Sequence, residues 1–135
     1  MTINILGTPY EVIEQSETDN PKLEEACGLC EQYSHRIVLA RYLSNPSKMS
    51  VENLDSFRRK VLRHEIIHAF LGESGLRGES DWAENEEMVD WFAIQLEKIY
   101  QAFVEADALE GYSKSKSDLD QAFKRVSDSL KKFQM

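Results

Sequence analysis

The sequence predicts an α+β fold of one domain, in which a small antiparallel or mixed sheet packs on two helices and a C-terminal amphipathic helix follows. Short segments with alternating apolar residues, separated by glycine and proline, fill the N-terminal third and are typical of strands. Two longer segments follow with apolar residues at steps of three and four, the period of a helix. The 135 residues, 41% of them hydrophobic, are enough for one sizeable core.

The N-terminal part predicts a hairpin and two further strands. Gly7-Thr8-Pro9 separates two alternating runs and predicts the turn of the hairpin. Ser34-His35 predicts a second turn, directly before the most apolar run of this part. The expected strands are residues 2–6, 10–14, 27–31 and 36–40.

A first helix is expected from Ser50, a suitable N-cap, to a stop at Ser74-Gly75-Leu76 with Gly75 in the left-handed conformation. A second helix is expected from Asp81, which can cap its start together with Glu84. The apolar face of the second helix is so broad that we expect it to be buried on more than one side.

The pentapeptide His64-Glu65-Ile66-Ile67-His68 lies inside the first predicted helix. Positions i and i+4 of a helix share a face about 6 Å apart, so both imidazoles can bind one metal ion. They continue the apolar, inward-facing stripe of that helix. Glu65 points about 100° round the helix, where it can meet a water molecule at the metal.

The second predicted helix offers carboxylates that could complete the site. Among three neighbouring acids, Glu84 is explained by capping and Glu87 faces elsewhere, so Glu86 is the expected third ligand. Asp90 lies one turn after Glu86 and can accept the N–H of a ligating histidine, which fixes its tautomer. Two histidines and one carboxylate, with one open position, form the ligand set of a catalytic zinc ion.

The C-terminal part predicts a link and an amphipathic helix. Residues 111–117 are rich in serine and lysine, which is typical of a flexible link. The apolar face of the helix consists of Leu119, Ala122, Phe123, Val126, Leu130 and Phe133. We expect residues 1–110 to form the metal-binding domain and residues 111–135 to pack on it.

Composition limits the partners and the compartment. A net charge of −8 argues against nucleic acid and anionic membranes. The N-terminus has neither a basic start nor a long apolar run, so we expect a cytoplasmic protein. Cys27 and Cys30 have no second pair for a zinc knuckle, and we expect reduced thiols. We expect a monomer.

The two motifs resemble those of the gluzincin metallopeptidases, the thermolysin-like group. The similarity consists of His64-Glu65-Ile66-Ile67-His68 and of Asn85-Glu86 with Asp90 after it. The short loop between the helices looks most like the single-domain minigluzincins. The segment from Ser50 to Trp91 is also similar to uncharacterised proteins of bacteriophages and mobile elements in Gram-positive bacteria.

The resemblance implies that His64, His68 and Glu86 bind zinc and that Asp90 supports His64. It further implies that Glu65 acts as general base and proton shuttle in the hydrolysis of peptide bonds, so that the expected partner is a peptide or protein substrate. Gluzincins usually add a histidine or tyrosine that stabilises the oxyanion, and no motif identifies that residue here. The residues that could take this role are His35, Tyr33, Tyr10 and Tyr112.

A second function class stays open at this point. The chain would then be a non-catalytic phage or mobile-element binding protein that keeps zinc as a structural clip. The missing oxyanion residue favours this alternative. The intact Glu65 disfavours it, because a structural metal site has no need of a base.

Overall fold

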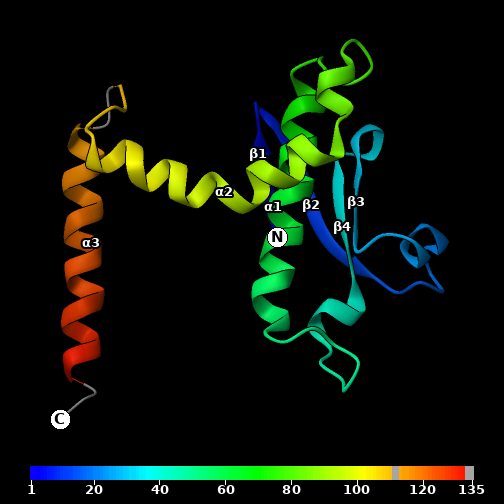
Figure 1. Cartoon of the computed structure of the whole chain (residues 1–135), viewed down its shortest axis with the longest axis horizontal. Coiled ribbons are helices and arrows are strands. Elements are labelled where there is room, and N and C mark those ends of the chain that lie inside the picture. The colour runs from blue at the N-terminus through cyan, green and yellow to red at the C-terminus, as the bar shows by residue number, and fades with distance from the viewer. Residues whose placement is uncertain (111–112, 133–135) are drawn as a thin grey trace. The chain divides into compact units, whose positions relative to one another are not determined.

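The computed structural model describes residues 1–110 and 113–132 and has the predicted α+β fold (Figure 1). A four-stranded mixed sheet with the strand order β1-β2-β4-β3 is followed by three helices. Contacts within the chain define two compact units, Met1–Gln95 and Leu96–Met135. The sheet, the first helix and all the predicted site residues belong to the first unit.

The N-terminal hairpin is confirmed, but its turn is shorter than predicted. Strands β1 (Thr2–Ile5) and β2 (Thr8–Gln15) pair antiparallel, with Ile5 opposite Thr8. The turn therefore consists of Leu6 and Gly7, which have φ values of 51° and 92°. Two-residue hairpin turns with positive φ at both positions match the twist of the strands. The predicted Gly7-Thr8-Pro9 turn thus lies one residue too far along the chain.

The two further strands are confirmed. Strand β4 (Arg36–Ala40) pairs parallel with β2 and antiparallel with β3 (Gly28–Glu31). It is the central apolar strand, and its residues Ile37–Ala40 are all buried, so both faces of the sheet are covered there. Strand β3 is left at the edge of the sheet.

Helix α1 (Leu54–Glu73) covers one face of the sheet and contacts β3 and β4 (Figure 1). It begins later than predicted, because Asn53 and not Ser50 is the N-cap. The Asn53 side chain accepts the N–H of Ser56 at 3.2 Å, and its φ of 55° is one that asparagine tolerates. The predicted stop is confirmed, with Gly75 at a φ of 82°.

Helix α2 (Glu86–Glu105) also begins later than predicted. Asp81 and Glu84 form a separate 3₁₀ turn, and the Asn85 side chain accepts the N–H of Met88 at 2.8 Å. Asparagine thus caps α2 where the sequence suggested an Asp81–Glu84 capping pair. The prediction of burial on several sides is wrong for the described side chains. Val89 and Ala93 are buried, but many large side chains are exposed: Trp91, Ile94, Leu96, Tyr100 and Phe103.

Helix α3 (Ser113–Lys132) begins inside the segment that was predicted to be a link. Its Phe123, Val126 and Leu130 side chains are exposed, and Phe133 lies outside the described residues. Packing of residues 111–135 on a domain of residues 1–110 stays a prediction. Among the described residues, no helix has the length and apolar character needed to span a membrane.

Candidate metal centre

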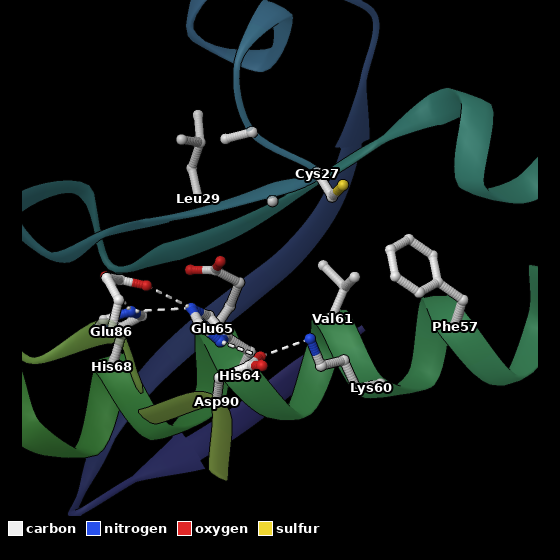
Figure 2. A pocket seen from close by; sticks show the side chains of 12 residues that line it. Cys27, Leu29, Phe57, Lys60, Val61, His64, Glu65, His68, Glu86 and Asp90 are labelled. Atoms are coloured by element: carbon white, nitrogen blue, oxygen red, sulfur yellow. Dashed lines mark hydrogen bonds and ion pairs between the residues drawn. The ribbon is translucent and has the colours of Figure 1, made fainter. Parts of the chain in front are cut away.

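The two histidines of α1 stand one turn apart and turn their rings toward each other (Figure 2). The Nε2 atoms of His64 and His68 are 3.1 Å apart, and the ring planes make an angle of 68°. His68 is buried and His64 is half-buried. Because α1 packs on the sheet, this half of the site is fixed by the fold itself.

Glu86 brings a carboxylate to the two rings from the first turn of α2. Its Oε2 lies 3.0 Å from Nε2 of His64, and its Oε1 lies 3.0 Å from Nε2 of His68. One donor atom from each of the three residues lies within 4.8 Å of the other two. The structure therefore brings together the three residues that the sequence predicts, and this group could hold a metal ion.

The donor set fits a small divalent cation such as zinc. Four tetrahedral ligands at about 2.1 Å from zinc lie roughly 3.4 Å from one another. The two Nε2 atoms are 3.1 Å apart, close to that value. Each lies 3.0 Å from a different oxygen of Glu86, and a set with one donor atom from each residue spans up to 4.8 Å. Two imidazoles and one carboxylate are nitrogen and oxygen donors that zinc accepts in catalytic sites, where a fourth position stays open.

Asp90 lies where the sequence predicts it, beside the other nitrogen of His64. Its Oδ1 is 3.3 Å from Nδ1 of His64 and 2.5 Å from Nζ of Lys60. A carboxylate in this position can accept the N–H of Nδ1, and in that tautomer Nε2 has a lone pair for a metal. The hydrogen bond and the charge of Lys60, and then the hydrogen bond with His64, hold the pKa of Asp90 below its usual value despite partial burial.

Lys60 was not predicted as a site residue from the sequence. It lies one turn before His64, a spacing that places both side chains on one face of α1. That spacing was the signal that could have revealed it, but its partner Asp90 lies on the other helix. In the structure Lys60 lines the same pocket as the metal group.

Burial lowers the pKa of His68 below its ordinary value, and the charge of Glu86 acts in the opposite direction. A lower pKa favours the neutral imidazole at neutral pH. The neutral form is the one that binds a metal.

Glu65 is the unusual group of the site. Only 6% of the residue is exposed, yet within the described part of the chain no hydrogen bond or ion pair reaches its carboxylate. Burial, together with the charge of Glu86, raises the pKa of Glu65 to about 7, against the opposing charge of Arg77. Figure 2 shows the side chain rising from α1 toward β3, beside the two histidines.

A pocket of about 400 Å³ opens over the metal group. Its far wall is the edge strand and the residues before it, Ala26–Leu29, and Phe57 and Val61 of α1 make part of its floor apolar (Figure 2). His64, Glu65, His68, Glu86 and Asp90 all line it. The pocket thus joins an apolar surface to a metal group and a carboxylate without a protein partner.

Gly28 allows β3 to lie close against α1 at this point. A Cβ atom at residue 28 would lie 3.0 Å from Cγ1 of Val61 and 3.1 Å from Cγ of Glu65. A side chain there would therefore require Val61, Glu65 or the strand itself to shift by a few tenths of an ångström. The sequence alone does not reveal the role of Gly28, because its contacts with Val61 and Glu65 join residues that lie far apart in the chain.

The residues proposed for oxyanion stabilisation do not line the metal pocket. The Tyr10 hydroxyl donates to Glu73 at 2.7 Å, and His35 lies 3.9 Å from the same carboxylate. Tyr33 is fully exposed and lines a different pocket. Tyr112 lies outside the described residues.

Comparison of the chain with models of protein families, with curated proteins and with solved structures gives no significant match. The residues and the geometry of this site are therefore the evidence for function.

Proposed function

We propose that the protein is a zinc-dependent peptidase. The observation that carries this proposal is Glu65, a buried carboxylate without a hydrogen-bond partner among the described residues, beside a group of two histidines and a carboxylate. The residue is largely buried but lines the pocket, and its carboxylate oxygens are not among the buried atoms that lack a partner, so they are open to the pocket. A carboxylate with a raised pKa in such a pocket is typical of a functional site. A site that only held a metal for stability would not require it.

Each residue then has a defined task. A zinc ion held by His64, His68 and Glu86 would polarise a water molecule and the carbonyl group of the substrate. Glu65 takes a proton from that water and delivers it to the leaving amine. Its place in the pocket lining beside the metal group is the one that such a proton shuttle needs. Asp90 holds the His64 ring in place.

The edge strand β3 supplies a binding surface for an extended peptide. Ala40 donates its backbone N–H to the carbonyl of Cys27 at 2.9 Å. Because hydrogen-bonded pairs alternate in an antiparallel ladder, Gly28 and Cys30 direct their backbone groups to the open edge. A peptide can add there as a further strand and lie across the metal pocket.

This proposal includes membership of the gluzincins, based on the two motifs and the pairing of His64 with Asp90. It also includes a cytoplasmic protein without nucleic-acid or membrane partners. The free thiols of Cys27 and Cys30 are in keeping with a reducing compartment. The similarity to phage and mobile-element proteins would make that compartment the host cytoplasm.

One observation favours the alternative of a non-catalytic zinc-binding module. Apart from the two proposed ligands, no histidine or tyrosine among the described residues lines the metal pocket. A peptidase of this kind would lack a side chain for the oxyanion unless the substrate or a shift of the chain supplied one. The alternative predicts bound zinc and no turnover.

Metal analysis of tag-free protein and a peptide-library cleavage assay test the proposal. The wild type should bind about one zinc ion per chain and cleave peptides. Glu65→Gln should keep the metal and lose about 100-fold or more in rate, the usual contribution of a general base. Glu52→Gln, at an exposed position outside the pocket, is the matched control. Wild-type turnover in Glu65→Gln would overturn the mechanism, and a zinc-loaded wild type without activity would favour the alternative.

A further inference from the structure

A second pocket, of about 670 Å³, lies at the other end of the edge strand. It shares Leu29 of β3 with the metal pocket and continues along Cys30 and Glu31 to residues 32–34. A peptide that pairs with β3 would therefore pass from one pocket to the other.

Two anchors to the end of α1 fix the walls of this second pocket. The backbone N–H of Arg77 donates to the carbonyl of Leu71 at 3.2 Å, which places Arg77 directly after the metal helix. The Gln32 side chain donates to the carbonyl of Gly72 at 3.1 Å. Arg77 and the chain after β3 are thus held to the same turn of α1, and the pocket is formed before any ligand arrives.

The charges in this pocket leave a cation available. Glu31 already forms an ion pair with Arg36. The distance between Nε of Arg36 and Oε1 of Glu31 is 2.6 Å. Among the described residues, no hydrogen bond or ion pair reaches the exposed Arg77 guanidinium, and Lys22 also lines the pocket. Glu84 is the one other carboxylate in the lining. Within the described part of the chain, the charged side chains of this lining that have no ion pair are therefore two cations, Arg77 and Lys22, and one acid, Glu84.

The direction of a bound peptide follows from the edge strand. Antiparallel pairing is the more stable arrangement, and β3 runs from the metal pocket toward the second pocket. A peptide paired antiparallel to β3 would have its N-terminal part over the second pocket. Residues before the scissile bond would then face Arg77.

We propose that Arg77 binds an acidic side chain of the substrate on the N-terminal side of the scissile bond. This proposal rests on the proposed peptidase function, because it names the class of substrate for that site. A guanidinium binds a carboxylate through two parallel hydrogen bonds, a geometry that lysine does not offer.

A binding assay separates this proposal from the question of turnover. The protein is zinc-loaded Glu65→Gln, and fluorescence anisotropy measures peptide affinity. The probes are labelled alanine-serine peptides with one leucine for the apolar floor beside Phe57 and Val61. There are three sets, one for each of the three positions before the leucine. Within a set, the peptides differ only at that position, which carries Glu, Gln or Lys.

We expect the Glu peptide of one set to bind about tenfold more tightly than its Gln counterpart, the size of one charged hydrogen-bonded pair. Adding Arg77→Ala should remove this difference, and adding Arg77→Glu should make the Lys peptide the preferred one. Arg59→Ala is the matched control, because Arg59 is exposed, pairs with Asp55 and lies outside the pocket.

The net charge of −8 disfavours non-specific binding of acidic peptides, so a preference for Glu that depends on Arg77 reports a local site. Equal affinities for Glu and Gln, a preference that survives Arg77→Ala, or no measurable peptide binding would each overturn the proposal. Cleavage by the wild-type protein is measured separately. A Glu preference without any turnover would leave the acidic-peptide site standing and reject the peptidase.

Discussion

The two helices that supply the metal donors are held in different ways. Helix α1 packs on the sheet, and only 9% of His68 is exposed. Glu86 stands on the first turn of α2, and 68% of its side chain is exposed. The difference indicates that folding of the sheet and α1 sets the histidine pair, whereas the carboxylate joins from a more exposed position.

The start of α2 is nevertheless tied to α1 by several contacts. Asp90 accepts from Lys60 and lies beside His64, and the Arg63 side chain donates to the carbonyl of Ala93 at 2.6 Å. These contacts place Glu86 next to the histidines. A metal ion would add a further link between the two helices, so metal binding and the docking of this turn should be coupled.

The largest effect is expected from removal of one histidine. His68→Ala should abolish stoichiometric zinc binding and the rise in melting temperature that zinc gives to the wild type, because binding free energy adds to folding free energy. Calorimetry with and without a chelator measures both. His35→Ala is the control, since His35 lies outside the metal pocket. Equal zinc-dependent stabilisation in His68→Ala would show that the histidine pair is not the metal site.

The next effect tests the link between the helices. Asp90→Asn should weaken zinc affinity by about 10- to 100-fold, the usual consequence of losing a carboxylate that orients a ligating histidine. A competition titration with a chromophoric chelator measures the affinity. Asp55→Asn, at an exposed position of α1 outside the pocket, should leave it unchanged. Equal zinc affinity in Asp90→Asn and the wild type would mean that α2 positions Glu86 without help from this contact.

Local sequence patterns were sufficient for much of the α1 half. The apolar run 36–40 predicted β4 with its observed bounds, and the i, i+4 spacing of His64 and His68 placed both rings on one face. Glu86 was also predicted, from its helical spacing to Asp90 and by assigning Glu84 to capping and Glu87 to another face, although the structure does not show the capping role of Glu84. Periods of two and of 3.6 residues carry such information within a few residues.

Other features depended on contacts that local patterns do not contain. Asn53 and Asn85 cap the two helices because each side chain meets a particular N–H, and both positions were missed. The choice of β3 as the edge strand beside the metal helix depends on pairing between distant segments. The burial of Glu65 follows from that pairing.

Substitution of Gly28 measures how much the stability of the fold depends on the close contact between β3 and α1. Gly28→Ala should destabilise the fold by about 1–3 kcal/mol, the usual cost of an added group in a tight contact, because its Cβ would press on Val61 and Glu65. Urea unfolding in the presence of a chelator measures the change. Gly7→Ala is a poor control because of its positive φ, so Ser56→Ala, exposed on α1, serves instead. Unchanged stability of Gly28→Ala would show that β3 can move away from the helix freely.

The smallest effect concerns a tie between the sheet and α1. Glu14 of β2 accepts hydrogen bonds from Ser44 and, at 3.1 Å, from Arg58 of α1. The bond from Ser44 and then the bond and charge of Arg58 lower the pKa of Glu14 despite partial burial. The ionised form is therefore favoured in the folded protein. Its contribution to stability is present above the pKa of the unfolded chain and is lost as the pH falls through the lower pKa of the folded protein.

Glu14→Gln should accordingly lower the melting temperature slightly at pH 7, and the difference from the wild type should shrink as the pH falls from about 5 to 3. Thermal scans in the presence of a chelator measure it without a contribution from bound metal. Glu11→Gln, exposed on the same strand, is the control. A difference that stays constant down to pH 3 would contradict the assignment. Apolar packing on the sheet, and not this ion pair, would then hold α1 in place. The contrast with α2 would be larger, because polar contacts tie the start of α2 to α1.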